Sequence, residues 1–131
     1  MYYQNYFNKY GAKRTEWNGS TYASKFEASY AAELDLRQKG GDIIKWEKQK
    51  TLDLRVNGQH ITSYKIDFIV HYPDGHREFV ETKGFPTPDW IIKWRLLEAT
   101  FEDFKENPDD CMLLVRQNSM KYFKNKKKGK K

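Results

Sequence analysis

Two acidic residues and a lysine lie near the middle of the chain, in segments that otherwise have the pattern of apolar strands. Only Thr82 separates Glu81 from Lys83, and alternate residues of a strand point to the same face. Asp67 precedes the turn at residues 73–75 by six positions, and Glu81 follows that turn by six. We therefore expect the carboxylates of Asp67 and Glu81 to lie opposite each other in an antiparallel pair of strands.

This set of side chains is suited to metal-assisted phosphodiester hydrolysis. Carboxylate oxygens are hard ligands that favour Mg²⁺ or Mn²⁺, and such an ion polarises a phosphate and generates hydroxide. The Lys83 ammonium would orient the attacking water or stabilise charge on the phosphate. We expect the Thr82 side chain to point away from the site, with its backbone carbonyl as a further metal ligand. The simpler interpretation of Glu81 and Lys83 is an ion pair on a solvated face.

Hydrophobic periodicity and turn signals predict the elements that must position these residues. Asn57-Gly58 and residues 73–75 are hairpin turns, and a strand that follows a helix is expected to pair in parallel. We place the last, continuously apolar strand at the centre of the sheet. The predicted fold is α/β, with a small mixed sheet flanked by helices. Its elements are a small hairpin at 14–23, a helix at 24–39, strands at 43–56, 59–72 and 76–83, a helix at 89–106 and a strand at 111–115.

The motifs and their order resemble the PD-(D/E)XK nuclease superfamily. Ile66-Asp67 followed by Glu81-Thr82-Lys83 is similar to its signature, although Ile66 replaces the proline of that signature. The resemblance implies a restriction-endonuclease-like core. The sequences at 24–27, 64–68 and 80–85 further resemble a family of small phage-encoded members, described as endonucleases or Holliday junction resolvases. The similarity spans residues 9–117.

What the resemblance implies is a Mg²⁺-dependent endonuclease, with Mn²⁺ as a substitute, that cuts branched DNA during recombination or repair. In the similar archaeal-type resolvases a first-helix glutamate joins the metal site, which assigns Glu27 to the site beside Asp67, Glu81 and Thr82. The residues themselves also support a different role, because Ser24 and Glu27 have the spacing of a helix capping box. Symmetric cutting of a four-way junction would require two active sites, hence a homodimer.

The charge of the chain is concentrated at one end. The 131 residues carry 24 Lys and Arg against 18 Asp and Glu, a net charge of +6. Seven of those lysines lie in residues 121–131. We expect one nuclease domain, residues 1–120 including an aromatic N-terminal arm, followed by a flexible lysine-rich tail. The cationic residues expected to contact DNA are Lys65, Lys93, Arg95, Lys126, Lys127 and Lys128.

Other features narrow the class of protein. The single cysteine, Cys111, excludes an intramolecular disulfide framework, and no apolar run is long enough to span a bilayer. Without a visible signal peptide, we expect a cytoplasmic protein, in a bacterial host cell if it is phage-encoded, with no membrane partner. Two alternatives to the enzyme remain: a non-catalytic nucleic-acid-binding module and a nuclease subunit that requires a partner protein. Gln49 has two interpretations, a residue that touches the site or the phosphate and a surface residue, and we favour the surface residue. We interpret the aromatic residues of the second helix as mainly core.

Overall fold

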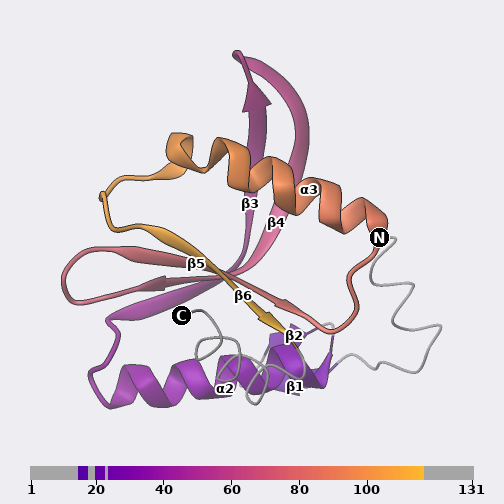
Figure 1. Ribbon diagram of the computed structural model, residues 1–131. Coiled ribbons are helices and arrows are strands. Elements are labelled where there is room, and N and C mark those ends of the chain that lie inside the picture. Colours follow the sequence, from indigo (N-terminus) through magenta and orange to yellow (C-terminus); the bar gives the residue numbers. More distant parts are fainter. Residues whose placement is uncertain (1–14, 18–19, 23, 117–131) are drawn as a thin grey trace, which may run out of the picture.

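The computed structural model describes residues 15–17, 20–22 and 24–116, and its elements follow the predicted order (Figure 1). The predicted N-terminal arm and lysine-rich tail lie outside the described residues. The mixed α/β fold is confirmed. The elements are β1 Thr15–Trp17, β2 Ser20–Tyr22, α2 Lys25–Lys39, β3 Lys45–Val56, β4 Gln59–His71, β5 Arg77–Lys83, α3 Pro88–Thr100, the 3₁₀ helix η1 Phe101–Phe104 and β6 Cys111–Arg116.

The main sheet has four strands in the order β3-β4-β5-β6, while β1 and β2 form a separate antiparallel pair. β3, β4 and β5 are antiparallel neighbours, and β6 pairs in parallel with β5 as predicted. The prediction that β6 is central is wrong. One side of β5 is already occupied by β4, so the α3 crossover places β6 at the edge of the described sheet, where residues 111–115 are only partly buried.

The two long helices cover opposite faces of the sheet (Figure 1). Each helix has its own apolar core, because the alternation of strand residues sends side chains to both faces. On the α2 face, Ala31 and Leu34 pack with Phe68 and Val80. On the α3 face, the buried residues are Leu52, Leu54, Tyr64, Ile66, Ile69, Phe79, Trp94, Leu97 and Phe101.

The helices begin at local sequence signals. Ser24 caps α2, its hydroxyl accepting a hydrogen bond from the Glu27 backbone N–H at 3.2 Å. Thr87 caps α3 in the same way, with the following proline at the first helical position. The predicted second helix is too long, since its α-helical part ends at Thr100 and continues only as the 3₁₀ turn η1. The Thr100 hydroxyl donates to the Leu96 carbonyl at 2.9 Å, where the helix tightens.

The β3–β4 hairpin changes its buried face along its length. Near the α2 core its inward residues include Phe68, whereas further out Leu52 and Ile66 pack toward α3. The simple alternation expected for β4 therefore fails between Ile66 and Phe68. On β3 the change coincides with Gln49, whose φ of 55° lies in the left-handed region. Figure 1 shows both strands turning at the centre of the sheet and projecting beyond α3.

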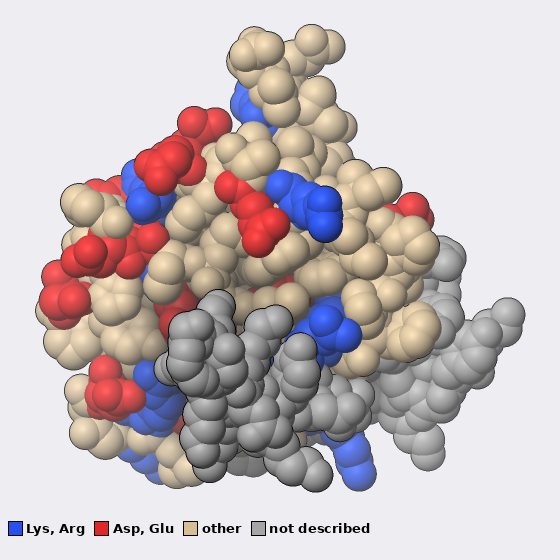
Figure 2. Space-filling view, in the orientation of Figure 1, with Lys and Arg blue, Asp and Glu red and all other residues tan. Residues whose placement is uncertain are grey.

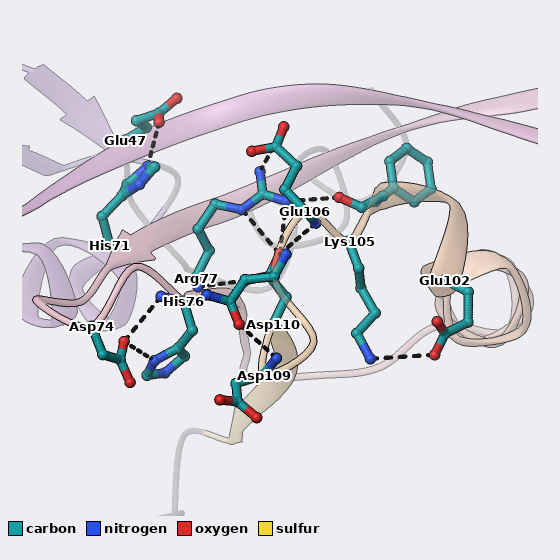
Figure 3. Close-up of polar contacts among 12 residues, drawn as sticks. Glu47, His71, Asp74, His76, Arg77, Glu102, Lys105, Glu106, Asp109 and Asp110 are labelled. Atoms are coloured by element: carbon teal, nitrogen blue, oxygen red, sulfur yellow. Dashed lines mark hydrogen bonds and ion pairs between the residues drawn. The ribbon is translucent and has the colours of Figure 1, made fainter.

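A buried carboxylate anchors the loop between η1 and β6 (Figure 3). Asp110 accepts hydrogen bonds from the Arg77 backbone N–H at 2.7 Å and from the Arg77 guanidinium at 3.0 Å. It also accepts from the backbone N–H groups of Glu106 and Asn107. Although burial opposes ionisation, these donors lower the Asp110 pKa to about 2. The contacts tie the start of β6 to the start of β5 and so support their parallel pairing.

Candidate active site at the fork between strands β4 and β5

The candidate site lies where β4 and β5 separate. Their last paired residues are Phe68 and Val80, and one further step along the register would pair Asp67 with Glu81. The predicted opposition of these two carboxylates therefore agrees with the register. Beyond this point β4 continues beside β3, while β5 continues beside β6 to Lys83. The fork leaves backbone groups without ladder partners, and side chains can take their place.

Asp67 spans the fork through Thr82. Its Oδ2 atom accepts one hydrogen bond from the Thr82 backbone N–H at 2.8 Å and another from the Thr82 hydroxyl at 2.7 Å. The expectation that the Thr82 side chain points away from the site is wrong, because its hydroxyl reaches Asp67 across the gap. In the other direction, the Asp67 backbone N–H lies close enough to the Glu81 carboxylate to lower its pKa. The Asp67 carboxylate of β4 thus contacts Thr82 of β5, and the Glu81 carboxylate of β5 contacts the backbone of Asp67 on β4.

Glu81 and Lys83 point to the same side of β5, as alternation predicts. Lys83 Nζ lies 3.4 Å from Glu81 Oε2, and both side chains are buried. The two residues do form an ion pair, but the expectation that it lies on a solvated face is wrong. Burial raises the Glu81 pKa to about 7, although Lys83 and Tyr64 act against that increase. Burial also lowers the Lys83 pKa, against the nearby carboxylates of Glu81 and Asp67. Among the described residues, Glu81 Oε1 is a buried atom that has no hydrogen-bond partner.

Glu27 belongs to the same electrostatic cluster. The pKa of Asp67 is raised well above its usual value by burial and by the negative charges of Glu81 and Glu27. Glu27 also acts on Lys83, so the first turn of α2 lies close to the fork. Its carboxylate is buried, while the Ser24 cap uses the Glu27 backbone N–H. The Ser24 half of the expected capping box is therefore present, and the place of Glu27 in the metal site stays a prediction.

The donor set suits a hard divalent cation. Three carboxyl groups and one ammonium carry a net charge of −2 when all are ionised, which one divalent ion would balance. Burial raises the pKa of both Asp67 and Glu81, and the charges of Glu81 and Glu27 raise that of Asp67 further. The unpartnered Glu81 oxygen is a free acceptor beside them. Within residues 15–17, 20–22 and 24–116, however, no three His, Cys, Asp or Glu side chains are already arranged as a ligand group. Binding would require the carboxylates to move toward the ion.

The cationic residues predicted to contact DNA lie outside the buried cluster. Lys65, Lys93 and Arg95 are exposed, and Lys126, Lys127 and Lys128 lie outside the described residues. Figure 2 shows acidic side chains gathered at the left, over the C-terminal end of α3 and the loop before β6. Exposed acids in that stretch are Glu98, Glu102, Asp103, Glu106 and Asp109. Lys93 and Arg95 lie near the middle of α3, N-terminal to those acids.

Three residues lie closer to the site than the sequence predicted: Gln49, Tyr64 and Trp90. Gln49 was interpreted as a surface residue, yet the pairs on either side of it place it opposite Asp67, in a left-handed conformation and partly buried. Tyr64 and Trp90 were assigned to the strand pattern and the core. The Trp90 ring lies 4.6 Å from Lys83 Nζ, and Trp90 Nε1 donates to the Tyr64 hydroxyl at 2.7 Å. Burial and the charge of Glu81 raise the Tyr64 pKa, which keeps that hydroxyl protonated.

One family of known proteins matches most of the chain. A family model described as "Protein of unknown function (DUF1064)" matches residues 7–112, which include Asp67, Glu81 and Lys83. The chain belongs to this DUF1064 family. No curated protein and no solved structure matches the chain. The family description states no activity, so the function of this DUF1064 protein has to be argued from the site itself.

The length and apolar character of the helices indicate whether any of them could cross a membrane. No helix of the described part of this DUF1064 protein combines the length and apolar character needed to cross a bilayer. The longest, α2, has 15 residues and carries several charged side chains.

Proposed function

We propose that this protein is a metal-dependent DNA endonuclease of the PD-(D/E)XK type. The observation that carries the proposal is the convergence of Asp67, Glu81, Lys83 and Glu27 on one buried fork of the sheet. These residues come from three separate elements, α2, β4 and β5, and their charges influence one another's pKa values. A buried excess of negative charge costs stability, so its presence favours a binding or catalytic role.

Each residue has a role in the proposed reaction. Asp67 and Glu81 hold Mg²⁺ or Mn²⁺ with help from Glu27 and the Thr82 backbone carbonyl. When bound, the ion would polarise the phosphate and lower the pKa of a water molecule. Thr82 orients Asp67 through the two hydrogen bonds to Oδ2. Lys83 stabilises negative charge on the phosphate or orients the attacking water, and its lowered pKa makes proton transfer near neutral pH easier.

Branched DNA is the proposed substrate, with a Holliday junction as the leading case and a homodimer as the acting form. The support comes from the resemblance to junction resolvases and from the charge distribution. The acidic end of α3 would repel a phosphate backbone, whereas Lys65, Lys93 and Arg95 are exposed to meet one. Symmetric cutting of a junction would use one site from each of two copies.

A cleavage assay tests the activity and the substrate together. The purified chain would be incubated with a labelled immobile four-way junction and with a linear duplex of matched sequence, each with Mg²⁺, Mn²⁺ or EDTA. Asp67→Asn and Glu81→Gln variants change charge with little change in shape. We expect paired nicks near the junction that need the metal and disappear in both variants.

The other outcomes separate the remaining hypotheses. Equal cutting of duplex and junction would retain the nuclease and remove the specificity for branched DNA. DNA binding without metal-dependent cutting, identical in wild type and variants, would favour the non-catalytic binding module. An inert chain that becomes active only when a second protein is added would identify a subunit that needs a partner.

A further inference from the structure

Two aromatic residues lie beside the acidic cluster, Tyr64 next to the Glu81 carboxylate and Trp90 next to the Lys83 ammonium. Trp90 lies in the first turn of α3, and Tyr64 lies on the outer part of β4. Trp90 Nε1 donates to the Tyr64 hydroxyl at 2.7 Å, and the Trp90 ring lies 4.6 Å from Lys83 Nζ. We propose that the Trp90–Tyr64 pair consists of positioning residues that hold Glu81 and Lys83 in the arrangement needed for metal binding and catalysis.

The direction of the hydrogen bonds follows from the chemistry of the two groups. An indole N–H can only donate, so the Tyr64 oxygen must act as its acceptor. The Tyr64 proton is then available for another acceptor, and the Glu81 carboxylate is the neighbour that it reaches. The indole thus orients the phenol, and the phenol orients the carboxylate. A hydrogen bond to a ligand carboxylate restricts its rotation and tunes its basicity, which is the usual role of groups behind a metal site.

The face of the same indole ring acts on Lys83. A cation over an aromatic ring is stabilised by the negative face of the ring, and the interaction is stronger where water is excluded. Lys83 is buried, so this contact partly replaces its lost hydration. It also supplies an attraction that competes with the Glu81 carboxylate 3.4 Å away. Lys83 is therefore held between the indole and the carboxylate, with its ammonium close to the fork.

The surrounding aromatic residues provide a matched control. Trp94 lies one turn further along α3, where it stacks on Trp90 with ring centroids 5.5 Å apart and contacts the Tyr64 ring at 6.2 Å. It belongs to the same apolar cluster and is buried. No hydrogen bond or cation–π contact described for Trp94 reaches Glu81 or Lys83. Trp94 is buried and Trp90 only partly buried, so a packing role alone predicts losses at Trp90 no larger than those at Trp94. A positioning role predicts a larger loss of metal affinity and kcat at Trp90.

The inference rests on the proposed function, and the experiment separates the two. Tyr64→Phe removes only the hydroxyl, and Trp90→Phe removes the indole N–H and reduces the ring. For the full chain and each variant, Mn²⁺ affinity would be measured by calorimetry, folding by thermal unfolding, and cleavage as separate kcat and KM values. We expect both variants to remain folded, to bind Mn²⁺ about tenfold more weakly and to lose about tenfold or more in kcat with little change in KM.

Trp94→Phe is expected to lower the melting temperature while leaving Mn²⁺ affinity and kcat within about twofold of wild type. Equal metal affinity and kcat in Tyr64→Phe and wild type would overturn the positioning role and leave the nuclease intact. Equal losses in Trp90→Phe and Trp94→Phe, in proportion to their loss of stability, would reduce the pair to core packing. A wild-type chain that neither binds Mn²⁺ nor cuts DNA would instead refute the proposed function, and this inference with it.

Discussion

Asp67 and Thr82 are joined by two hydrogen bonds to a single oxygen. The Oδ2 atom of Asp67 accepts from the Thr82 backbone N–H at 2.8 Å and from the Thr82 hydroxyl at 2.7 Å. The two residues lie on strands that no longer pair at this point, so the carboxylate replaces a missing part of the β ladder. The residue proposed to bind the metal ion therefore also closes the fork. A substitution that keeps the acceptor oxygen and removes the charge should therefore affect stability and activity in opposite directions.

Asp67→Asn should separate these two effects. The amide keeps an oxygen that can accept from Thr82, while it removes one negative charge from the cluster. Without metal, we expect this variant to be more stable than wild type by about 1–2 kcal/mol at pH 8, since a buried charge is removed and its repulsion with Glu81 and Glu27 is relieved. Cleavage should fall roughly 100-fold or more. Urea unfolding in EDTA and the junction assay measure the two changes. A variant that still cuts DNA at the wild-type rate would contradict the role in metal binding, and one no more stable than wild type in EDTA would contradict the cost of the buried charge.

Glu81 should make metal-free stability decrease as the pH rises. Its pKa is about 7 in the folded chain, above the ordinary value of 4.5, so the folded chain holds this proton more tightly than the unfolded chain. The contribution of Glu81 to stability is then fully present below pH 4.5 and declines by about 3 kcal/mol as the pH rises to about 7. The raised pKa of Asp67 acts in the same direction. The lowered pKa of Lys83 acts oppositely, at higher pH.

Urea midpoints between pH 5 and pH 8 would reveal this decline in EDTA. Mn²⁺ should reduce it, because the ion neutralises the carboxylates that repel one another. Glu81→Gln is the control, since the amide does not titrate, and its profile should be flatter than that of wild type. Identical profiles for wild type and Glu81→Gln would show that this carboxyl has an ordinary pKa in the folded chain.

Lys83→Met should dissociate metal binding from cleavage. Methionine retains an unbranched side chain of similar length in the buried position and removes the ammonium. We expect cleavage to fall roughly 100-fold, because charge on the phosphate loses its stabilising partner. Mn²⁺ affinity should be equal to that of wild type or higher, since a positive charge 3.4 Å from Glu81 is gone. Calorimetry and single-turnover cleavage provide the two readings. Loss of Mn²⁺ binding together with activity would indicate that Lys83 only maintains the site.

Gln49→Gly should stabilise the protein. Gln49 has a φ of 55°, a conformation in which a side chain costs about 1 kcal/mol and glycine has no such penalty. We expect a gain of up to about 1 kcal/mol in urea unfolding. Gln49→Ala keeps the penalty and serves as the matched control, so it should show no gain. Comparable stability of the glycine and alanine variants would show that the backbone at this position is not strained.

Asp110→Asn should weaken the fold without altering the cluster at the fork. The variant loses the ionic contact with Arg77, which leaves a partly buried guanidinium with only the longer contact to the exposed Glu106 carboxylate, at 3.9 Å. We expect a loss of about 3 kcal/mol. The Asp110 pKa is lowered to about 2, so its stabilising contribution is present above about pH 4 and is lost as the pH falls toward 2. Acid titrations followed by circular dichroism should show a shallower loss in the variant. Superimposable acid curves would contradict this role.

Part of this protein was predictable from local pattern. The period of two along the strands, the Asn-Gly turn and the Ser24 cap predicted the elements. Equal spacing around the turn at 73–75 predicted that Asp67 faces Glu81, and alternation placed Glu81 and Lys83 together. These features depend on neighbours close in sequence or on one hairpin, where covalent geometry limits the possible arrangements.

Other features were decided by contacts between distant segments. The position of β6 at the edge depended on which side of β5 was vacant. The hydrophobic pattern of a strand does not predict its neighbours in the sheet. The turn of the Thr82 hydroxyl toward Asp67 arises because the strands separate, which alternation alone does not predict. The contact of Trp90 with Tyr64 and Lys83 exists only because α3 packs across the fork. Sequence by itself determined which chemical groups are present and their local order. The tertiary structure decided which of them are buried together, because burial and charge coupling depend on neighbours that the chain brings together only when it folds.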